Sequence, residues 1–163
     1  MPEVTIDETR DYELVARMLA QSPALVYPPS PQRLASMRNA IFLLARYGGE
    51  PAGVVCIQKI QFFLSIIKYL FVLPQFRRRG IATKLSGRAI EIGDERFNTP
   101  ILIATTSVNN VPVHAIMARF GFRPVAIFKS PLSTRRIVVF LKNLRHVEGG
   151  EGIEDINLEV GGW

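Results

Sequence analysis

One segment constrains the fold of this chain more than any other: residues 70–85 read LFVLPQFRRRGIATKL. The apolar run at residues 65–73 favours a β-strand that stops at Pro74. Beyond three arginines and Gly80, residues 79–97 carry apolar side chains at helical spacing, which predicts a helix. A strand that leads through a glycine-containing loop into a helix indicates a fold in which helices pack on a sheet.

The loop between this strand and this helix has the composition of a phosphate site. A helix N-terminus binds phosphate readily because its first backbone N–H groups have no partner within the helix. Gly80 can adopt a positive φ and lets a ligand approach the backbone, and Ala82 keeps a nearby position small. The loop adds charged and hydroxyl side chains at Arg77, Arg78, Arg79 and Thr83. The spacing matches neither a P-loop nor a dinucleotide fingerprint, so these residues alone leave a solvated, capped helix start equally open.

The remaining segments predict a mixed sheet flanked by helices. Strands are expected at residues 3–6, 41–47, 52–61, 65–73, 101–106, 125–129 and 136–141. Helices are expected at residues 7–21, 31–38, 79–97 and 110–120. Asp7 suits the first N-cap, Pro31 the first turn of the second helix, and Gly121 the end of the last one. Residues 101–106 are apolar enough to predict a strand buried on both faces. The order indicates an α/β (α+β) fold with about seven strands and four helices.

Length and charge suggest one domain with an appended tail. The chain has 163 residues, which fits a single domain at residues 1–145, followed by an acidic, Gly-rich tail at residues 146–163. All 20 Lys and Arg precede residue 146, whereas five of the 14 acids follow it. The body therefore carries 20 basic and nine acidic side chains, a formal charge of +11. Such a body attracts anions: a phosphorylated cofactor, nucleic acid or an acidic protein.

The chain offers little for redox, metal or membrane chemistry. Its single cysteine, Cys56, excludes an internal disulfide, and with only two histidines the residue counts predict no metal site. Cys56 lies within an apolar strand and is expected to be a buried thiol rather than a nucleophile. The longest apolar run, residues 62–74, is too short for a membrane span, and no signal peptide is visible. We expect a cytoplasmic protein without a membrane partner.

The segment at residues 70–85 resembles motif A of the GNAT superfamily of N-acyltransferases, Val-x-Pro-x-aromatic-Arg-x-x-Gly-x-Gly/Ala. The residues that match it are Val72, Pro74, Phe76, Arg77, Gly80 and Ala82. A second block, residues 101–122, is similar to motif B, with a strand, Asn110 and a helix that closes on Gly121. With two motifs in register, the resemblance covers about residues 3–143. It implies the GNAT fold, in which two central strands of the mixed sheet splay apart.

The resemblance also implies a reaction. The co-substrate would be acetyl-CoA or another acyl-CoA, with its acyl group moving to a primary amine by direct attack. A bulge would free backbone groups for the pantetheine arm, and the Val72 N–H would polarise the thioester carbonyl. The pyrophosphate would lie on the amides of residues 78–82, and Asn110 would contact the cofactor or serve as a helix N-cap. The cofactor-binding residues implied are Phe71, Val72, Leu73, Arg77, Arg78, Arg79, Gly80, Ile81, Ala82, Thr83 and Asn110.

The sequence departs from the family at the residues that would move protons. Many members carry a Tyr four residues before the motif B glycine, where this chain has Met117, which cannot donate a proton. No Asp or Glu occurs between Glu50 and Glu91, so the central strands supply no carboxylate base. Two candidates for the catalytic step remain: His114, a residue type that exchanges protons near neutral pH, and Tyr69 on the splayed strand. Positioning and ordered water are the alternative.

The acceptor is the part that the sequence leaves open. The resemblance implies an acceptor pocket between residues 25–38, with Tyr27, and the loop at residues 129–135. The amine would belong to a small molecule, peptide or protein. Two alternatives keep the fold: an enzyme acting on nucleic acid, such as aminoacyl-tRNA or a DNA base, and a non-catalytic acyl-CoA-binding domain. The charge favours the first and Met117 the second. Acyl chain length and a possible homodimer also stay open.

Overall fold

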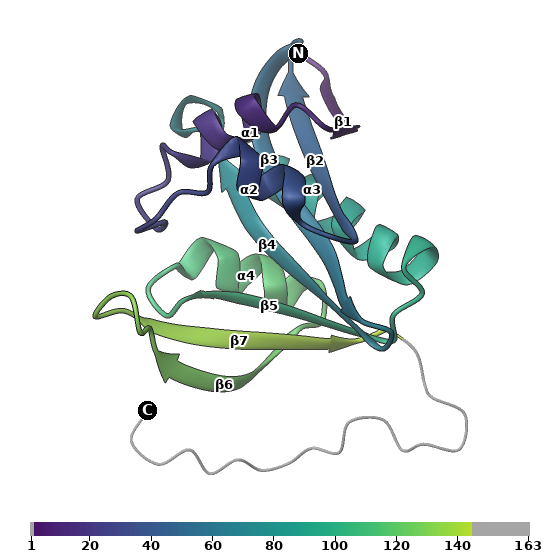
Figure 1. Cartoon of the computed structure of the whole chain (residues 1–163), viewed down its shortest axis with the longest axis vertical. Helices are drawn as coiled ribbons and strands as arrows, with labels where there is room; N and C mark the ends of the chain where they lie inside the picture. The colour runs from purple at the N-terminus through teal and green to yellow at the C-terminus, as the bar shows by residue number, and fades with distance from the viewer. Residues whose placement is uncertain (1, 145–163) are drawn as a thin grey trace.

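A seven-stranded mixed sheet organises the molecule, seen here in a computed structural model that describes residues 2–144 (Figure 1). The strand order is β1-β2-β3-β4-β5-β7-β6. All neighbouring strands are antiparallel except β4 and β5, which are parallel. The strands are β1 (Val4–Thr9), β2 (Ala40–Tyr47), β3 (Glu50–Gln61), β4 (Leu64–Val72), β5 (Ile101–Ser107), β6 (Arg123–Lys129) and β7 (Arg136–Asn143). The predicted acidic tail lies outside the described residues.

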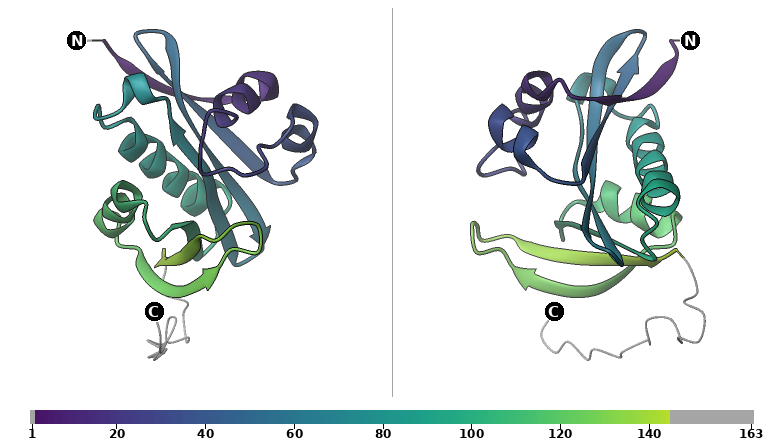
Figure 2. Two further views of the ribbon diagram at one scale, coloured as in Figure 1. Left: turned by 90° about the vertical axis from the view of Figure 1, so that its left-hand side faces the viewer. Right: turned by 45° about the vertical axis from the view of Figure 1, so that its right-hand side comes forward.

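Helices cover the sheet from both sides (Figure 2). They are α1 (Tyr12–Leu19), α2 (Pro31–Ser36), α3 (Ile81–Glu91) and α4 (Val111–Arg119), with a 3-10 turn at Pro74–Phe76 and a π-turn at Ile92–Arg96. The side chains of α1 and α2 pack on one face, whereas α3 and α4 pack on the other. The predicted mixed sheet with four helices is confirmed. Within residues 2–144, no helix is long and apolar enough to cross a membrane.

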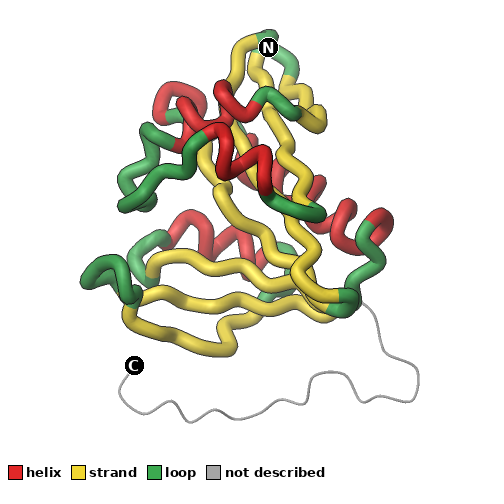
Figure 3. The backbone as a smooth tube through the Cα atoms, viewed as in Figure 1, coloured by secondary structure: helices red, strands yellow, loops and turns green. Residues whose placement is uncertain are grey.

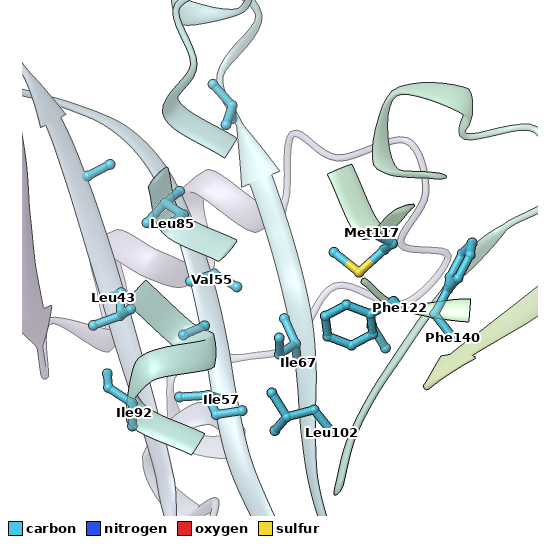
Figure 4. Packing of buried hydrophobic residues seen from close by; sticks show 14 of the residues in the cluster. Leu43, Val55, Ile57, Ile67, Leu85, Ile92, Leu102, Met117, Phe122 and Phe140 are labelled. Atoms are coloured by element: carbon cyan, nitrogen blue, oxygen red, sulfur yellow. The ribbon is translucent and has the colours of Figure 1, made fainter. Parts of the chain in front are cut away.

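Strand alternation divides the core into two clusters. Successive side chains of a strand point to opposite faces, so β2 and β3 supply apolar residues to both. Leu43, Val55 and Ile57 pack against α3, together with Ile67 and Leu102 (Figure 4). The other face of β2 and β3 contacts α1 and α2 through Phe42, Leu44, Val54 and Cys56. Each large aliphatic side chain that is fully buried in this way contributes about 1.5–3 kcal/mol to folding.

The beginning of the chain differs from the prediction. Asp7 is not the N-cap of the first helix: it lies within β1 and pairs with Leu44 of β2. The strand continues to Thr9, and the N-cap is Asp11, whose side chain accepts a hydrogen bond from the Leu14 N–H at 3.1 Å. Pairing with β2 extends the strand into a polar stretch that local preferences do not mark as β.

The prediction that β5 is buried on both faces is also wrong. Leu102 and Ala104 are buried, whereas the residues that alternate with them are partly or fully exposed. The cluster that includes α1 and α2 has no member from β5, β6 or β7 among the described residues. These helices therefore cover only one part of the sheet, and one face of β5 stays accessible.

The two central strands separate along their length. Residues 64–67 of β4 pair with residues 101–104 of β5, and the pairing ends there although β4 continues to Val72. Figures 1 and 3 show the strands close together at one end and apart at the other. The expected splayed strands are thus present, and they open toward the start of α3.

Candidate active site

A β-bulge turns the second half of β4 away from regular pairing. Tyr69 and Leu70 together face the single residue Val55 of β3. Tyr69 has a φ of 58°, in the left-handed region that non-glycine residues rarely adopt. A bulge of this kind increases the local twist of its strand. It lies where β4 leaves β5, so the backbone beyond it faces open space rather than a neighbouring strand.

The ladder beyond the bulge sets the direction of the Val72 N–H. The Leu73 N–H donates to the Ala52 carbonyl at 2.8 Å. Because successive residues direct their backbone groups to opposite edges, the Val72 N–H and carbonyl face the edge that β5 has left. On that edge, Arg77 Nε donates to the Val72 carbonyl at 3.2 Å, and its guanidinium lies 5.8 Å from the centre of the Phe71 ring. The Val72 N–H is therefore fixed toward the gap.

The start of α3 has the features of an anion site. Gly80 is the N-cap with a φ of 75°, no side chain caps the helix, and its first turn contains no acidic residue. The first intrahelical bond is made by the Lys84 N–H to the Gly80 carbonyl at 3.1 Å, so the preceding N–H groups, at residues 81–83, point out of the helix end. A Cβ on Gly80 would meet no atom within 4 Å. Backbone donors, helix dipole and neighbouring Arg78 all favour a phosphate here.

A pocket of about 800 Å³ joins these features. It extends along the opened edge of β4, the start of α3 and the start of α4. Nine of the predicted cofactor residues line it: Phe71, Val72, Arg77, Arg78, Gly80, Ile81, Ala82, Thr83 and Asn110. Among the described residues that line it there is no Asp or Glu. The pocket is thus apolar along the strand and positively charged where the helix begins.

Two of the predicted cofactor residues lie elsewhere. Leu73 is buried in the cluster beneath α1 and α2. Arg79 lies with its guanidinium 4.6 Å from the centre of the Tyr47 ring, and its Nη1 donates to the Tyr47 hydroxyl at 2.8 Å. Neither is among the residues that line the pocket. The sequence could not show this, because Tyr47 is 32 positions away on β2.

Asn110 stands at the N-cap position of α4 without capping it. Its side chain makes no capping bond, and Nδ2 instead donates to Thr106 Oγ1 at 3.0 Å. The amide is thereby oriented on the pocket wall. Sequence reasoning missed three neighbouring lining residues, Thr106, Ser107 and Asn109. The polar run that follows the apolar start of β5 is the signal that would have found them.

The predicted proton carriers do not line the pocket. His114 donates from Nε2 to the Ser107 carbonyl at 3.0 Å, and its ring packs edge-on against Phe140 at 5.3 Å. Tyr69 packs against the cluster beneath α1 and α2. Met117, which occupies the usual Tyr position, is 1% exposed and lies beside Phe122 (Figure 4).

The far end of the pocket is formed by two loops. Ser22, Pro23 and Ala24 follow α1, and Arg135 lies between β6 and β7. Arg135 Nη2 donates to the Pro23 carbonyl at 3.2 Å, which links the loops. Of the two ranges predicted for the acceptor, residues 129–135 contribute Arg135 to the pocket lining, whereas no residue of 25–38 lines it, and Tyr27 is 74% exposed.

Cys56 is buried within β3, as predicted. Burial raises the pKa of its thiol to about 12, and nearby Lys68 lowers it only in part. The thiolate, which is the nucleophilic form, is therefore strongly disfavoured in the folded protein.

The sequence profile described as the Acetyltransferase (GNAT) family matches residues 8–122 of this chain. The chain belongs to the GNAT acetyltransferase family. This GNAT chain is 31% identical over 81 residues to Aminoglycoside N(6')-acetyltransferase type 1 from Acinetobacter baumannii. The match covers 50% of the chain and 49% of the relative, so the chain spans about half the length of the curated relative that it matches.

Solved structures share the GNAT architecture over nearly their whole length. The protein yncA from Salmonella typhimurium, solved with its cofactor acetyl-CoA, superposes with a TM-score of 0.76 at 12% identity, covering 91% of this chain and 98% of that one. The ribosomal-protein-S18-alanine N-acetyltransferase from Escherichia coli gives 0.73 at 16% identity, covering 94% and 99%. At these identities the likeness establishes the fold.

Proposed function

We propose that the protein transfers an acetyl group from acetyl-CoA to a primary amine by direct attack of the amine on the thioester. The observation that carries this proposal is the separation of β4 from β5 immediately before the uncapped start of α3. One pocket then offers the Val72 N–H beside an anion site at Gly80. Membership of an acetyltransferase family supports the same chemistry.

The pocket residues suggest how the cofactor binds. Its pyrophosphate would lie on the backbone amides of residues 78–82, with positive charge from Arg77 and Arg78. The pantetheine arm would follow the opened edge of β4 toward Val72. Arg79, which lies on the Tyr47 ring, would add only long-range attraction. Asn110, oriented by Thr106, would face the cofactor from α4.

The chemical step needs few side chains. The neutral amine attacks the thioester carbonyl carbon, and negative charge develops on the oxygen that the Val72 N–H contacts. The carbon–sulfur bond then breaks, and CoA leaves as a thiolate. A free thiol has a pKa of about 8.5, so water can protonate this leaving group. The ionisable side chains among the described lining residues are arginines, which cannot act as bases. We therefore infer that water also takes the proton of the acceptor ammonium.

Calorimetric titration with acetyl-CoA and CoA tests the cofactor site. We expect micromolar binding to the wild type and a loss of at least about 100-fold in Gly80→Glu, because bulk and negative charge enter the phosphate site. Gly49→Glu is the matched control: Gly49 has a φ of 86°, open space around its Cβ, and a place in the β2–β3 turn. It carries the same backbone strain and charge without touching the pocket.

Two outcomes would redirect the proposal. A wild type that binds neither acetyl-CoA nor CoA overturns it, and the arginine-flanked loop then serves another anion. Binding without turnover of any amine supports the second candidate, a non-catalytic acyl-CoA-binding domain. That candidate is favoured by Met117 and by the lack of a carboxylate among the described lining residues. A nucleic-acid acceptor, which the basic body favours, would be marked by a steep loss of affinity with salt.

A further inference from the structure

The far end of the pocket, formed by residues 22–24 and Arg135, carries positive charge only; we call it the acceptor end. Its described lining residues from the two loops are Ser22, Pro23, Ala24 and Arg135, so the one charged group among them is a guanidinium. Arg135 is exposed, and its bond to the Pro23 carbonyl uses one Nη2 donor. A guanidinium has five N–H donors, so the others remain available toward the pocket.

The lack of carboxylates extends well beyond the lining residues. The acidic residues within residues 2–144 lie at residues 3–13, around β1 and the start of α1, at Glu50, the first residue of β3, and at residues 91–95, at the end of α3 and in the π-turn. Residues 14–49, 51–90 and 96–144 contain none. These ranges include both loops at the acceptor end, all of β4, the phosphate loop, β5 and α4. Among the described residues that line the pocket, an acceptor with several positive charges would therefore meet arginines without a compensating carboxylate.

The same composition bears on which amine can react. Without a carboxylate base, an amine reacts in proportion to the fraction that is already neutral. An α-amino group has a pKa of about 7.7–8.0 and a lysine side chain one of about 10.4, so at pH 7 the α-amine has a neutral fraction roughly 300-fold larger. The pocket therefore favours an α-amine over a lysine side chain.

We propose that the acceptor is the α-amine of a short peptide or amino-acid derivative that carries a carboxylate, and that Arg135 binds this carboxylate. The inference rests on the proposed function and names its substrate class. A guanidinium binds a carboxylate through two parallel N–H···O bonds, which gives orientation as well as affinity. A polycationic acceptor, such as an aminoglycoside with its several ammonium groups, is the class that this arrangement disfavours.

Three synthetic peptides of matched length test the assignment. Ala-Ala-Glu-amide, Ala-Ala-Gln-amide and Ala-Ala-Lys-amide share one N-terminus, and the first two differ only by a charged oxygen in place of an amide nitrogen. Both kcat/KM with acetyl-CoA and calorimetric binding to the CoA-saturated full chain are measured. We expect the order Glu, Gln, Lys, with about a ten-fold step between Glu and Gln for a charge-assisted pair.

Variants of the loop isolate the guanidinium. Arg135→Gln keeps an amide donor for the Pro23 carbonyl but removes the charge, so we expect the Glu peptide to fall to the level of the Gln peptide. Arg136→Gln removes the charge of an adjacent, exposed arginine that does not line the pocket, and should keep the preference. A preference that survives in Arg135→Gln overturns the role of this residue.

The two proposals fail in different ways. Equal binding of the three peptides, or faster acetylation of the Lys peptide or of kanamycin, overturns the acceptor assignment and leaves the acetyltransferase proposal intact. Failure of the wild type to bind CoA overturns the acetyltransferase proposal and the acceptor assignment with it. Binding of the Glu peptide to the CoA complex with the expected preference supports the assignment without requiring turnover.

Discussion

The two halves of β4, residues 64–67 and residues 68–72, are both largely apolar but differ in their strand neighbours. Residues 64–67 are paired on both sides, with β3 and with β5. Residues 68–72 contain the bulge and keep only β3 as a neighbour. Both halves are largely apolar, so hydrophobicity does not distinguish them. The difference is the missing neighbour, which leaves backbone donors and acceptors of the second half for a ligand.

The closed half satisfies its polar groups within the protein. Ser65 is buried, and its hydroxyl lies 2.9 Å from the Thr99 hydroxyl, which in turn lies 3.0 Å from the Gly93 carbonyl. In the open half, the Val72 carbonyl is satisfied by Arg77, while its N–H faces the pocket. One strand thus has a fully paired half and a half that borders the pocket, and the bulge lies just beyond the point where the pairing with β5 ends.

Among the variants proposed here, Val72→Pro, in the open half of β4, should have the largest effect on kcat. Proline removes the N–H that we assign to the developing oxyanion, and this N–H makes no ladder bond to β3. We expect kcat to fall by about 10²–10³-fold, the usual loss for one oxyanion donor. Single-turnover rates with saturating acetyl-CoA measure it.

Leu73→Pro is the matched control for this variant. The φ of Leu73 is −55°, which proline adopts without strain, but its N–H bonds the Ala52 carbonyl. We expect lower stability, by about 2–5 kcal/mol, because the variant loses both this bond and the buried leucine side chain, with kcat retained. Full turnover in Val72→Pro would contradict the oxyanion role.

Shortening a buried side chain in the closed half should lower stability and leave cofactor binding nearly unchanged. Ile67 is buried in the cluster beneath α3, and Ile67→Ala should lower the free energy of unfolding by about 2–5 kcal/mol through the cavity it leaves. The affinity for acetyl-CoA should change little, because Ile67 itself does not line the pocket. Urea unfolding and calorimetry check the two quantities, and Ile66→Ala, at a partly exposed position, should cost less. A weakened cofactor affinity would show that the halves are coupled.

The sequence predicted what depends on neighbouring residues along the chain. The strand that stops before Pro74, the glycine at the start of α3 and the end of α4 at Gly121 with a φ of 81° are all local patterns. These local patterns determine most of the proposed phosphate site, which is why nine predicted residues line the pocket. The family resemblance added the splay and the bulge, which no local pattern marks.

The features that the sequence did not predict depend on contacts between residues that are distant along the chain. Asp7 lies in β1 because β2 pairs with it, and Arg79 leaves the pocket because Tyr47 offers a ring and a hydroxyl. The bond from Arg135 to the Pro23 carbonyl joins positions 112 apart and links the two loops at the far end of the pocket. The one-sided burial of β5 follows from which helices cover it. None of these tertiary contacts can be read from the local sequence pattern alone.

His114 gives the smallest expected effect and decides whether the open half needs a side-chain base. Its place in proton transfer stays a prediction, and the geometry offers a positioning role: Nε2 donates to the carbonyl of Ser107, a residue on the pocket wall. We expect His114→Ala to lower kcat by about three-fold, in keeping with the loss of one hydrogen bond, with little change in acetyl-CoA affinity.

The conservative variant and the pH profile separate the two roles of His114. Glutamine can place an amide donor where Nε2 lies, so His114→Gln should restore turnover if the residue only positions Ser107. The dependence of kcat/KM on pH should then be the same in the wild type and both variants, because it reports the acceptor amine alone. If His114 carries the proton instead, glutamine fails to rescue, and an inflection present in the wild type disappears in both variants. Water as the base, and with it the preference for an acceptor of low pKa, would then be wrong.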